Sequence, residues 1–200
     1  MATCEARILH PCPAAALTFG PAPARIERFG SRGDRRIVGD EQRSDRAVRI
    51  LKQAYERQMA GRLEEAVRLY QASIAESPTA EAHTFLGWTL SQMGRHEEAI
   101  EQCKIAITLD PEFGNPYNDI GSYLIHLGRV DQAIPWLELA KKAPRYEPRH
   151  FPYLNLYRVY VKLGELDRAQ RELQQALFIQ QALEQQTGVV EEDAGTGSVN

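Results

Sequence analysis

Apolar residues between residues 51 and 183 recur at the spacing of amphipathic helices. Tyr117, Ile120 and Leu124 are separated by three and four positions, which places them on one side of a helix. A second stripe, beginning with Ala133 and Leu137, follows after a short interval. The pattern predicts two consecutive helices, and similar pairs of stripes lie before and after this stretch.

Four glycines predict where each pair of helices turns. Gly61, Gly94, Gly128 and Gly164 are 33, 34 and 36 residues apart, and each is followed three residues later by an acidic residue and five residues later by an alanine. Glycine can adopt the left-handed backbone conformation that closes a helix. The acidic residue then lies in the first turn of the next helix, where the helix dipole favours it. The repeat therefore predicts four helix hairpins.

The repeated unit resembles the tetratricopeptide repeat, a motif of 34 residues. That motif has a small residue in its first helix, a glycine at the turn, alanines around a large apolar residue in its second helix, and a closing proline. The matching residues are Ala54, Gly61, Ala66, Tyr70, Ser73 and Pro78 in the first repeat, Gly87, Gly94, Ala99, Cys103, Ala106 and Pro111 in the second, Gly121, Gly128, Ala133, Leu137 and Ala140 in the third, where Pro144 comes one position early, and Gly164, Ala169, Leu173 and Ala176 in the fourth.

The resemblance implies an all-α fold, a right-handed superhelical solenoid of about four helix-turn-helix repeats with a long C-terminal helix. Residues 41–186 are expected to form the repeat domain. Its repeats are predicted at about 47–79, 80–113, 114–149 and 150–183.

The two ends of the chain lack this periodicity. Residues 1–40 contain several prolines and glycines, and residues 187–200 are rich in glycine and acidic residues. Both ends are predicted to be disordered.

The family resemblance also implies a function, namely a non-enzymatic protein–protein interaction module or scaffold. Such solenoids present a concave groove lined by the first helix of each hairpin, and a protein or peptide partner is expected there. Aromatic side chains favour interface centres, and asparagine amides can bond a peptide backbone in both directions. The predicted groove residues are Leu51, Lys52, Tyr55, Phe85, Trp88, Gln92, Asn115, Asn118, Asp119, Ser122, His126, Asn155, Arg158 and Lys162.

Some members of the family grip the C-terminal carboxylate of heat-shock chaperones with a set of lysine, arginine and asparagine side chains. The corresponding positions here hold Leu51, Tyr55, Phe85, Asn115 and Asp119. The sequence therefore lacks the cationic clamp, and the resemblance does not extend to that activity.

Two other kinds of function are weaker alternatives. An RNA-binding helical repeat stays open through Arg158 and Lys162, although a net charge of −3 gives no basic field for nucleic acid. Cys4, His10 and Cys12 are potential metal ligands, but a structural zinc site needs four. No metal site or cofactor is predicted.

Catalysis is also not predicted. Asp119, Ser122 and His126 share a helical face like a nucleophilic triad. Backbone N–H groups in the middle of a helix are already bonded, so no oxyanion hole accompanies the serine.

The chain has no run of about 18 apolar residues, so no membrane insertion is predicted. The expected location is the cytoplasm. The sequence leaves the partner's identity and the oligomeric state open.

Overall fold

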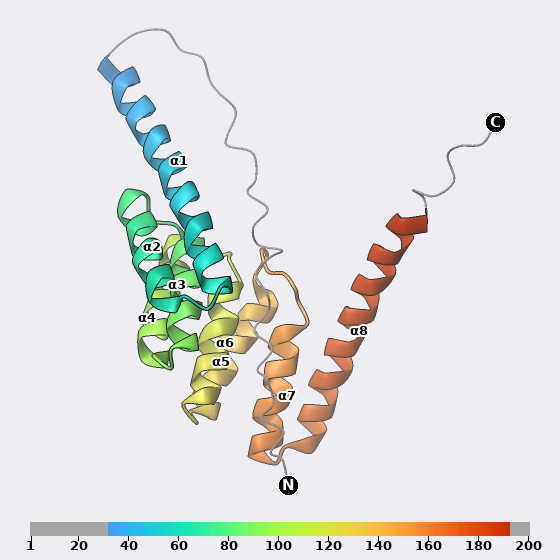
Figure 1. Ribbon diagram of the computed structural model, residues 1–200. Helices are drawn as coiled ribbons and strands as arrows, with labels where there is room; N and C mark the ends of the chain where they lie inside the picture. Colours follow the sequence, from blue (N-terminus) through green and yellow to red (C-terminus); the bar gives the residue numbers. More distant parts are fainter. Residues whose placement is uncertain (1–31, 193–200) are drawn as a thin grey trace, which may run out of the picture.

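The computed structural model describes residues 32–192, and that part of the chain folds as eight α-helices (Figure 1). The helices, in chain order, are α1 (Arg32–Met59), α2 (Leu63–Glu76), α3 (Ala80–Gln92), α4 (His96–Leu109), α5 (Asn115–His126), α6 (Val130–Lys142), α7 (Phe151–Leu163) and α8 (Leu166–Glu192).

Each odd-numbered helix forms a hairpin with the helix that follows it. Gly61, Gly94, Gly128 and Gly164 have φ values between 73° and 77°, so the left-handed conformation predicted for the turn glycines is confirmed. Pro116 and Pro152 lie at the starts of α5 and α7, where a missing N–H removes no helical bond.

Small residues allow the two helices of a hairpin to approach closely. A Cβ atom added to Gly121 of α5 would lie 2.5 Å from Cδ2 of Leu137, a fully buried residue of α6. At Gly87 of α3, the added atom would lie 3.1 Å from the carbonyl oxygen of Ala99 in α4. The side-chain volume at these positions therefore sets the distance between the helices.

The hairpins stack in chain order, and each second helix packs against the next first helix. The first helices also contact one another in the order α1, α3, α5 and α7. A continuous apolar core runs through the stack and includes Tyr70, Ile120, Tyr123 and Leu156. The all-α solenoid of helix hairpins predicted from the sequence is confirmed.

The connection between α6 and α7 pairs with the connection between α4 and α5. Gly114 donates a backbone hydrogen bond to the carbonyl of Arg145 at 2.9 Å, and Arg145 donates one to the carbonyl of Glu112 at 3.1 Å. The Arg145 side chain forms ion pairs with Glu81 and Asp110. The connection thus joins the third hairpin to the second.

The first and last helices are longer than the sequence suggested. Helix α1 begins at Arg32, so it reaches into the segment 1–40; the disorder predicted for that segment stays a prediction. Helix α8 continues to Glu192, so it reaches into the segment 187–200, whose predicted disorder likewise stays a prediction. Both extensions continue a helix already begun, and adding a residue to an existing helix is far easier than nucleating one. Residues 1–31 and 193–200 lie outside the described part.

Candidate functional site

Helix α5 has two sides with different surroundings. Ile120 and Leu124 face the space between α4 and α6. Asn115 lies on the opposite side of the helix, together with Asp119 and Ser122, which follow it by four and seven positions. We call the surface formed by this side of α5 and the matching sides of α1, α3 and α7 the first-helix face.

The predicted groove residues differ widely in their exposure. Leu51 and Phe85 belong to the apolar core, and the Phe85 ring stacks on Tyr70 at 6.0 Å and meets Tyr55 edge-on at 5.7 Å. Trp88 also belongs to the core, with 9% of its surface exposed. The aromatic end of the predicted groove therefore contributes to the packing between hairpins.

The remaining predicted groove residues are polar, and their solvent exposure ranges from buried to exposed. Those with little exposure are Asn115, Asn118, Asp119, Ser122 and Asn155. Those that are exposed or half-buried are Lys52, Tyr55, Gln92, His126, Arg158 and Lys162.

The structure brings three of the polar residues into one hydrogen-bonded chain. The Asn155 amide of α7 donates to Asn118 Oδ1 of α5 at 2.9 Å, and both residues are buried. Arg158 Nη1 donates to Asn155 Oδ1 at 3.4 Å. We call Asn118 and Asn155 the amide ladder. It joins two neighbouring first helices through groups that also match a peptide backbone.

Asp119 is the residue after Asn118 in α5 and is also buried, with 6% of its surface exposed. Burial raises the pKa of its carboxyl group to about 7, while a hydrogen bond from Asn118 opposes the shift. Among the described residues, no lysine, arginine or histidine forms an ion pair with Asp119. The first-helix face thus contains a buried acid whose charged form lacks a cation.

Tyr146, from the connection between α6 and α7, lies close to the same carboxyl group. Its ring packs against Gly114, where an added Cβ would overlap the Tyr146 side chain. Burial and the negative charge of Asp119 both raise the pKa of Tyr146. The Tyr146 hydroxyl is buried and has no hydrogen-bond partner within the described part of the chain.

Positively charged side chains lie at one end of the first-helix face, near His126. Burial lowers the pKa of His126, and the nearby His96, Lys162 and Arg158 lower it further. The His126 ring also stacks on His96 at 5.0 Å. The C-terminal ends of α5 and α7 therefore form a cationic end of this face.

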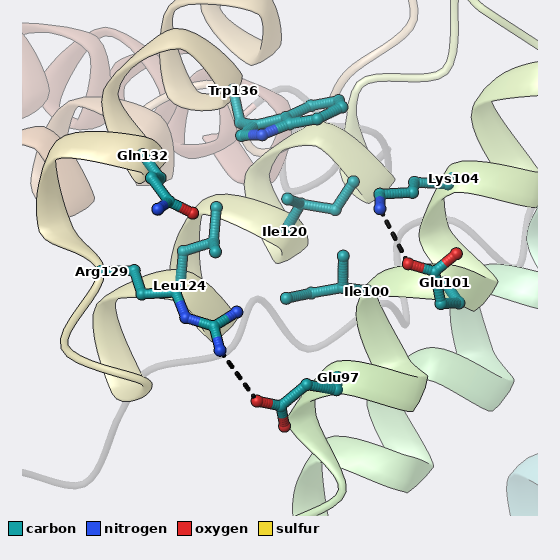
Figure 2. Close-up of a pocket in the computed structure, with 9 residues that line it drawn as sticks. All are labelled: Glu97, Ile100, Glu101, Lys104, Ile120, Leu124, Arg129, Gln132 and Trp136. Atoms are coloured by element: carbon teal, nitrogen blue, oxygen red, sulfur yellow. Dashed lines mark hydrogen bonds and ion pairs between the residues drawn. The ribbon is translucent and has the colours of Figure 1, made fainter.

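A separate hollow of about 200 Å³ opens between α4, α5 and α6 (Figure 2). Ile100, Ile120 and Leu124 line its apolar part, and the Trp136 ring lies along one side. Arg129 bonds Glu97 at 3.3 Å, and Lys104 bonds Glu101 at 2.7 Å, so the charges around the hollow are paired. We call this hollow the α4–α6 crevice.

The α4–α6 crevice was not predicted from the sequence, although the repeat pattern contained a signal. Trp136 lies eight residues after its turn glycine, where the other repeats have Leu69, Gln102 and Glu172. Gln102 bonds His83 at 2.8 Å, and Glu172 pairs with Lys141. Comparing this position between repeats would have identified the single aromatic residue.

Within residues 32–192, no group of three or more His, Cys, Asp and Glu side chains is arranged to hold a metal ion. Cys4, His10 and Cys12 lie outside the described part. The described helices include none that is long and apolar enough to cross a membrane.

Comparison with protein families agrees with the repeat pattern. Two family models described as tetratricopeptide repeat match residues 80–113 and 115–145. A small glutamine-rich tetratricopeptide repeat-containing protein 2 from Mycosarcoma maydis is 41% identical over 44 residues. This match covers 22% of the present chain and 12% of the relative, so the chain aligns with a small part of that protein.

Several solved structures share the fold. PilF of Pseudomonas aeruginosa has a TM-score of 0.63 and 20% identity, covering 70% of this chain and 63% of PilF. A thermophilic tetratricopeptide repeat protein of Thermus thermophilus has a TM-score of 0.58 and 26% identity, with 66% and 74% covered. The first repeat domain of Spaghetti (RPAP3), bound to the HSP90 peptide SRMEEVD, has a TM-score of 0.56 and 16% identity, with 60% and 95% covered.

Proposed function

The chain is a tetratricopeptide repeat protein, and we propose that its first-helix face binds an extended segment of a protein partner. The fold is that of a protein-interaction scaffold. Two repeat domains of Spaghetti (RPAP3) with this fold hold an HSP90 peptide. That likeness supports a peptide as the kind of ligand, and the side chains of this chain suggest where it binds.

The amide ladder is the observation that carries the proposal. At the other end of the face, α1 and α3 meet through the apolar rings of Tyr55 and Phe85. Helices α5 and α7 are instead joined by the amides of Asn118 and Asn155. Burying polar groups between helices is less favourable than apolar packing unless they are satisfied. Amides that bond each other can also exchange those bonds for the N–H and C=O groups of a bound strand.

The cationic end favours a partner segment with an acidic portion. Arg158 is half-buried and Lys162 is exposed, and both lie near His126. Exposed charges act mainly on the rate of association and weaken with salt. We expect these residues to orient the segment, while the ladder holds its backbone.

The test begins with a random library of short peptides selected on the full chain, because the natural partner is unidentified. The selected peptides are then measured by isothermal titration calorimetry against Asn155→Ala, which removes one side of the ladder. Affinity should fall by about tenfold or more, in the range found for central interface residues. Asn155 is preferred to Trp88 because truncating the large Trp88 side chain in the apolar core would leave a much larger cavity and destabilise the fold more.

Arg68→Ala is the matched control, since Arg68 is an exposed residue of the second helix α2. Its affinity for the selected peptides should equal that of the parent chain. Circular dichroism establishes that both variants stay folded. Equal binding by folded Asn155→Ala and the parent would refute the proposal, as would a selection that yields no peptide.

A further inference from the structure

Asp119 has surroundings that differ from those of the acidic residues that form ion pairs in this chain. Glu98 bonds Arg95, and Asp110 pairs with Arg145. Both of those carboxyl groups have a pKa below the ordinary value, because the neighbouring guanidinium favours the charged form. Asp119 is the more deeply buried residue, yet within residues 32–192 the neutral amide of Asn118 is its only side-chain hydrogen-bond partner.

No structural role explains this carboxyl group. It neither caps a helix nor joins two helices, because the link between α5 and α7 runs through Asn118 and Asn155. A buried charge without a partner opposes folding. Groups that oppose folding in this way tend to mark functional sites, where a ligand supplies what the fold lacks.

We propose that Asp119 is the receptor for a basic side chain, lysine or arginine, of the partner segment. This inference rests on the proposed function, because it assumes that a peptide lies on the first-helix face. A carboxylate offers two oxygens with about four acceptor positions, and Asn118 occupies one of them. The positions left over suit an ammonium or guanidinium group, with which a charge-assisted bond forms in a site of low exposure.

The neighbours of Asp119 favour a cation over other ligands. Asn118 and Tyr146 are neutral, and the Tyr146 hydroxyl has no partner within the described residues. That hydroxyl can accept a hydrogen bond from the same basic group. An acidic side chain would meet the like charge of Asp119, so acidic residues belong near Arg158 and Lys162 instead. The partner segment should therefore contain a basic residue at Asp119 and an acidic residue toward the cationic end.

The experiment is a double-mutant cycle on the full chain. Peptides selected from the random library are synthesised with their lysine or arginine, and again with glutamine in its place. Each is titrated into the parent chain and into Asp119→Asn. Glutamine should weaken binding to the parent about tenfold or more and should change binding to Asp119→Asn about threefold or less, because the charge pair exists only in the parent.

The control acid is Glu97, which lies on the opposite side at the α4–α6 crevice and pairs with Arg129. In Glu97→Gln, the effect of the glutamine-substituted peptide should match that in the parent chain. Asp119→Asn keeps the shape of the side chain and removes a buried charge, so it should fold; circular dichroism checks this. Asp119→Glu keeps the charge and should retain part of the discrimination.

The outcomes separate this inference from the proposed function. Selected peptides that lack a basic residue but lose affinity with Asn155→Ala would overturn the role of Asp119 alone. So would an equal effect of glutamine in the parent and in folded Asp119→Asn. Peptides that bind independently of Asn155 would overturn the proposed function, and the role of Asp119 with it.

Discussion

Replacing Asp119 with asparagine should make the protein more stable at neutral and alkaline pH. Burial raises the pKa of Asp119 from its ordinary value of 3.8 to about 7 in the folded chain. The difference is about three units, and each unit corresponds to roughly 1.4 kcal/mol. The buried charge thus costs up to about 4 kcal/mol above pH 7. Water that enters the site on ionisation reduces this figure.

The sign of the pH dependence follows from the number of bound protons. Between pH 4 and 7 the folded chain holds a proton on Asp119, whereas the unfolded chain has lost it. The free energy of unfolding should therefore fall as pH rises through this range and stay level above it. The titratable neighbours Cys103, Tyr123 and Tyr146 all have raised pKa values, so they stay neutral there.

Urea unfolding of the parent and Asp119→Asn from pH 4.5 to 8.5 provides the measurement. His126 and His150 have lowered pKa values and tilt both curves the other way, but they are common to both proteins. The difference between the curves therefore isolates Asp119. It should grow with pH up to about 7 in favour of asparagine. A difference that stays constant with pH would refute the argument that the folded chain buries this charge.

The remaining predictions concern packing and charge. Gly121→Ala should destabilise the chain by about 1–3 kcal/mol in urea unfolding, because the new Cβ meets Leu137; a gain in stability, as is usual for glycine to alanine in an open helix, would contradict the close contact. Ala133→Trp, at a fully buried residue of α6, should cost roughly 1–3 kcal/mol or more and lower the melting temperature; an unchanged melting temperature would place Ala133 outside the packed contact. Asp110→Asn should weaken the ion pair with Arg145 and lower the free energy of unfolding at neutral pH. The loss should be much smaller in strong acid, because protonation there removes the charge of Asp110 in the parent as well. An equal loss under both conditions would contradict a role for that charge. Arg158→Ala should slow the association of selected peptides at low salt and have little effect at high salt in stopped-flow measurements; equal effects at both would exclude steering.

The sequence predicted the hairpins because their signals are local. A glycine that must adopt positive φ, an acidic first turn and apolar stripes at helical spacing all act within a few residues. The ends were harder, because the apolar pattern stops before the helices do. In α1 and α8, helix propagation extends past the span in which the apolar pattern predicts a helix.

The candidate site was only partly predictable. The repeat phase placed Asn118, Asp119 and Asn155 on one face, but it could not show that two of them bond each other. Nor could it show that Phe85 and Trp88 pack into the core, because that depends on the neighbouring hairpin. Tyr146 belongs to the connection that departs from the repeat, so its approach to Asp119 required the folded chain.

Site-specific photo-crosslinking tests most directly whether the first-helix face is the binding surface. A photoreactive phenylalanine derivative replaces Gln92, an exposed residue of the first helix α3, or Glu101, an exposed residue beside the α4–α6 crevice. Each full chain is irradiated with a peptide selected from the random library, and the products are identified by mass spectrometry. The account predicts a crosslink from position 92 and none from position 101. A crosslink from position 101 alone would place the partner on the other side of the solenoid and contradict it.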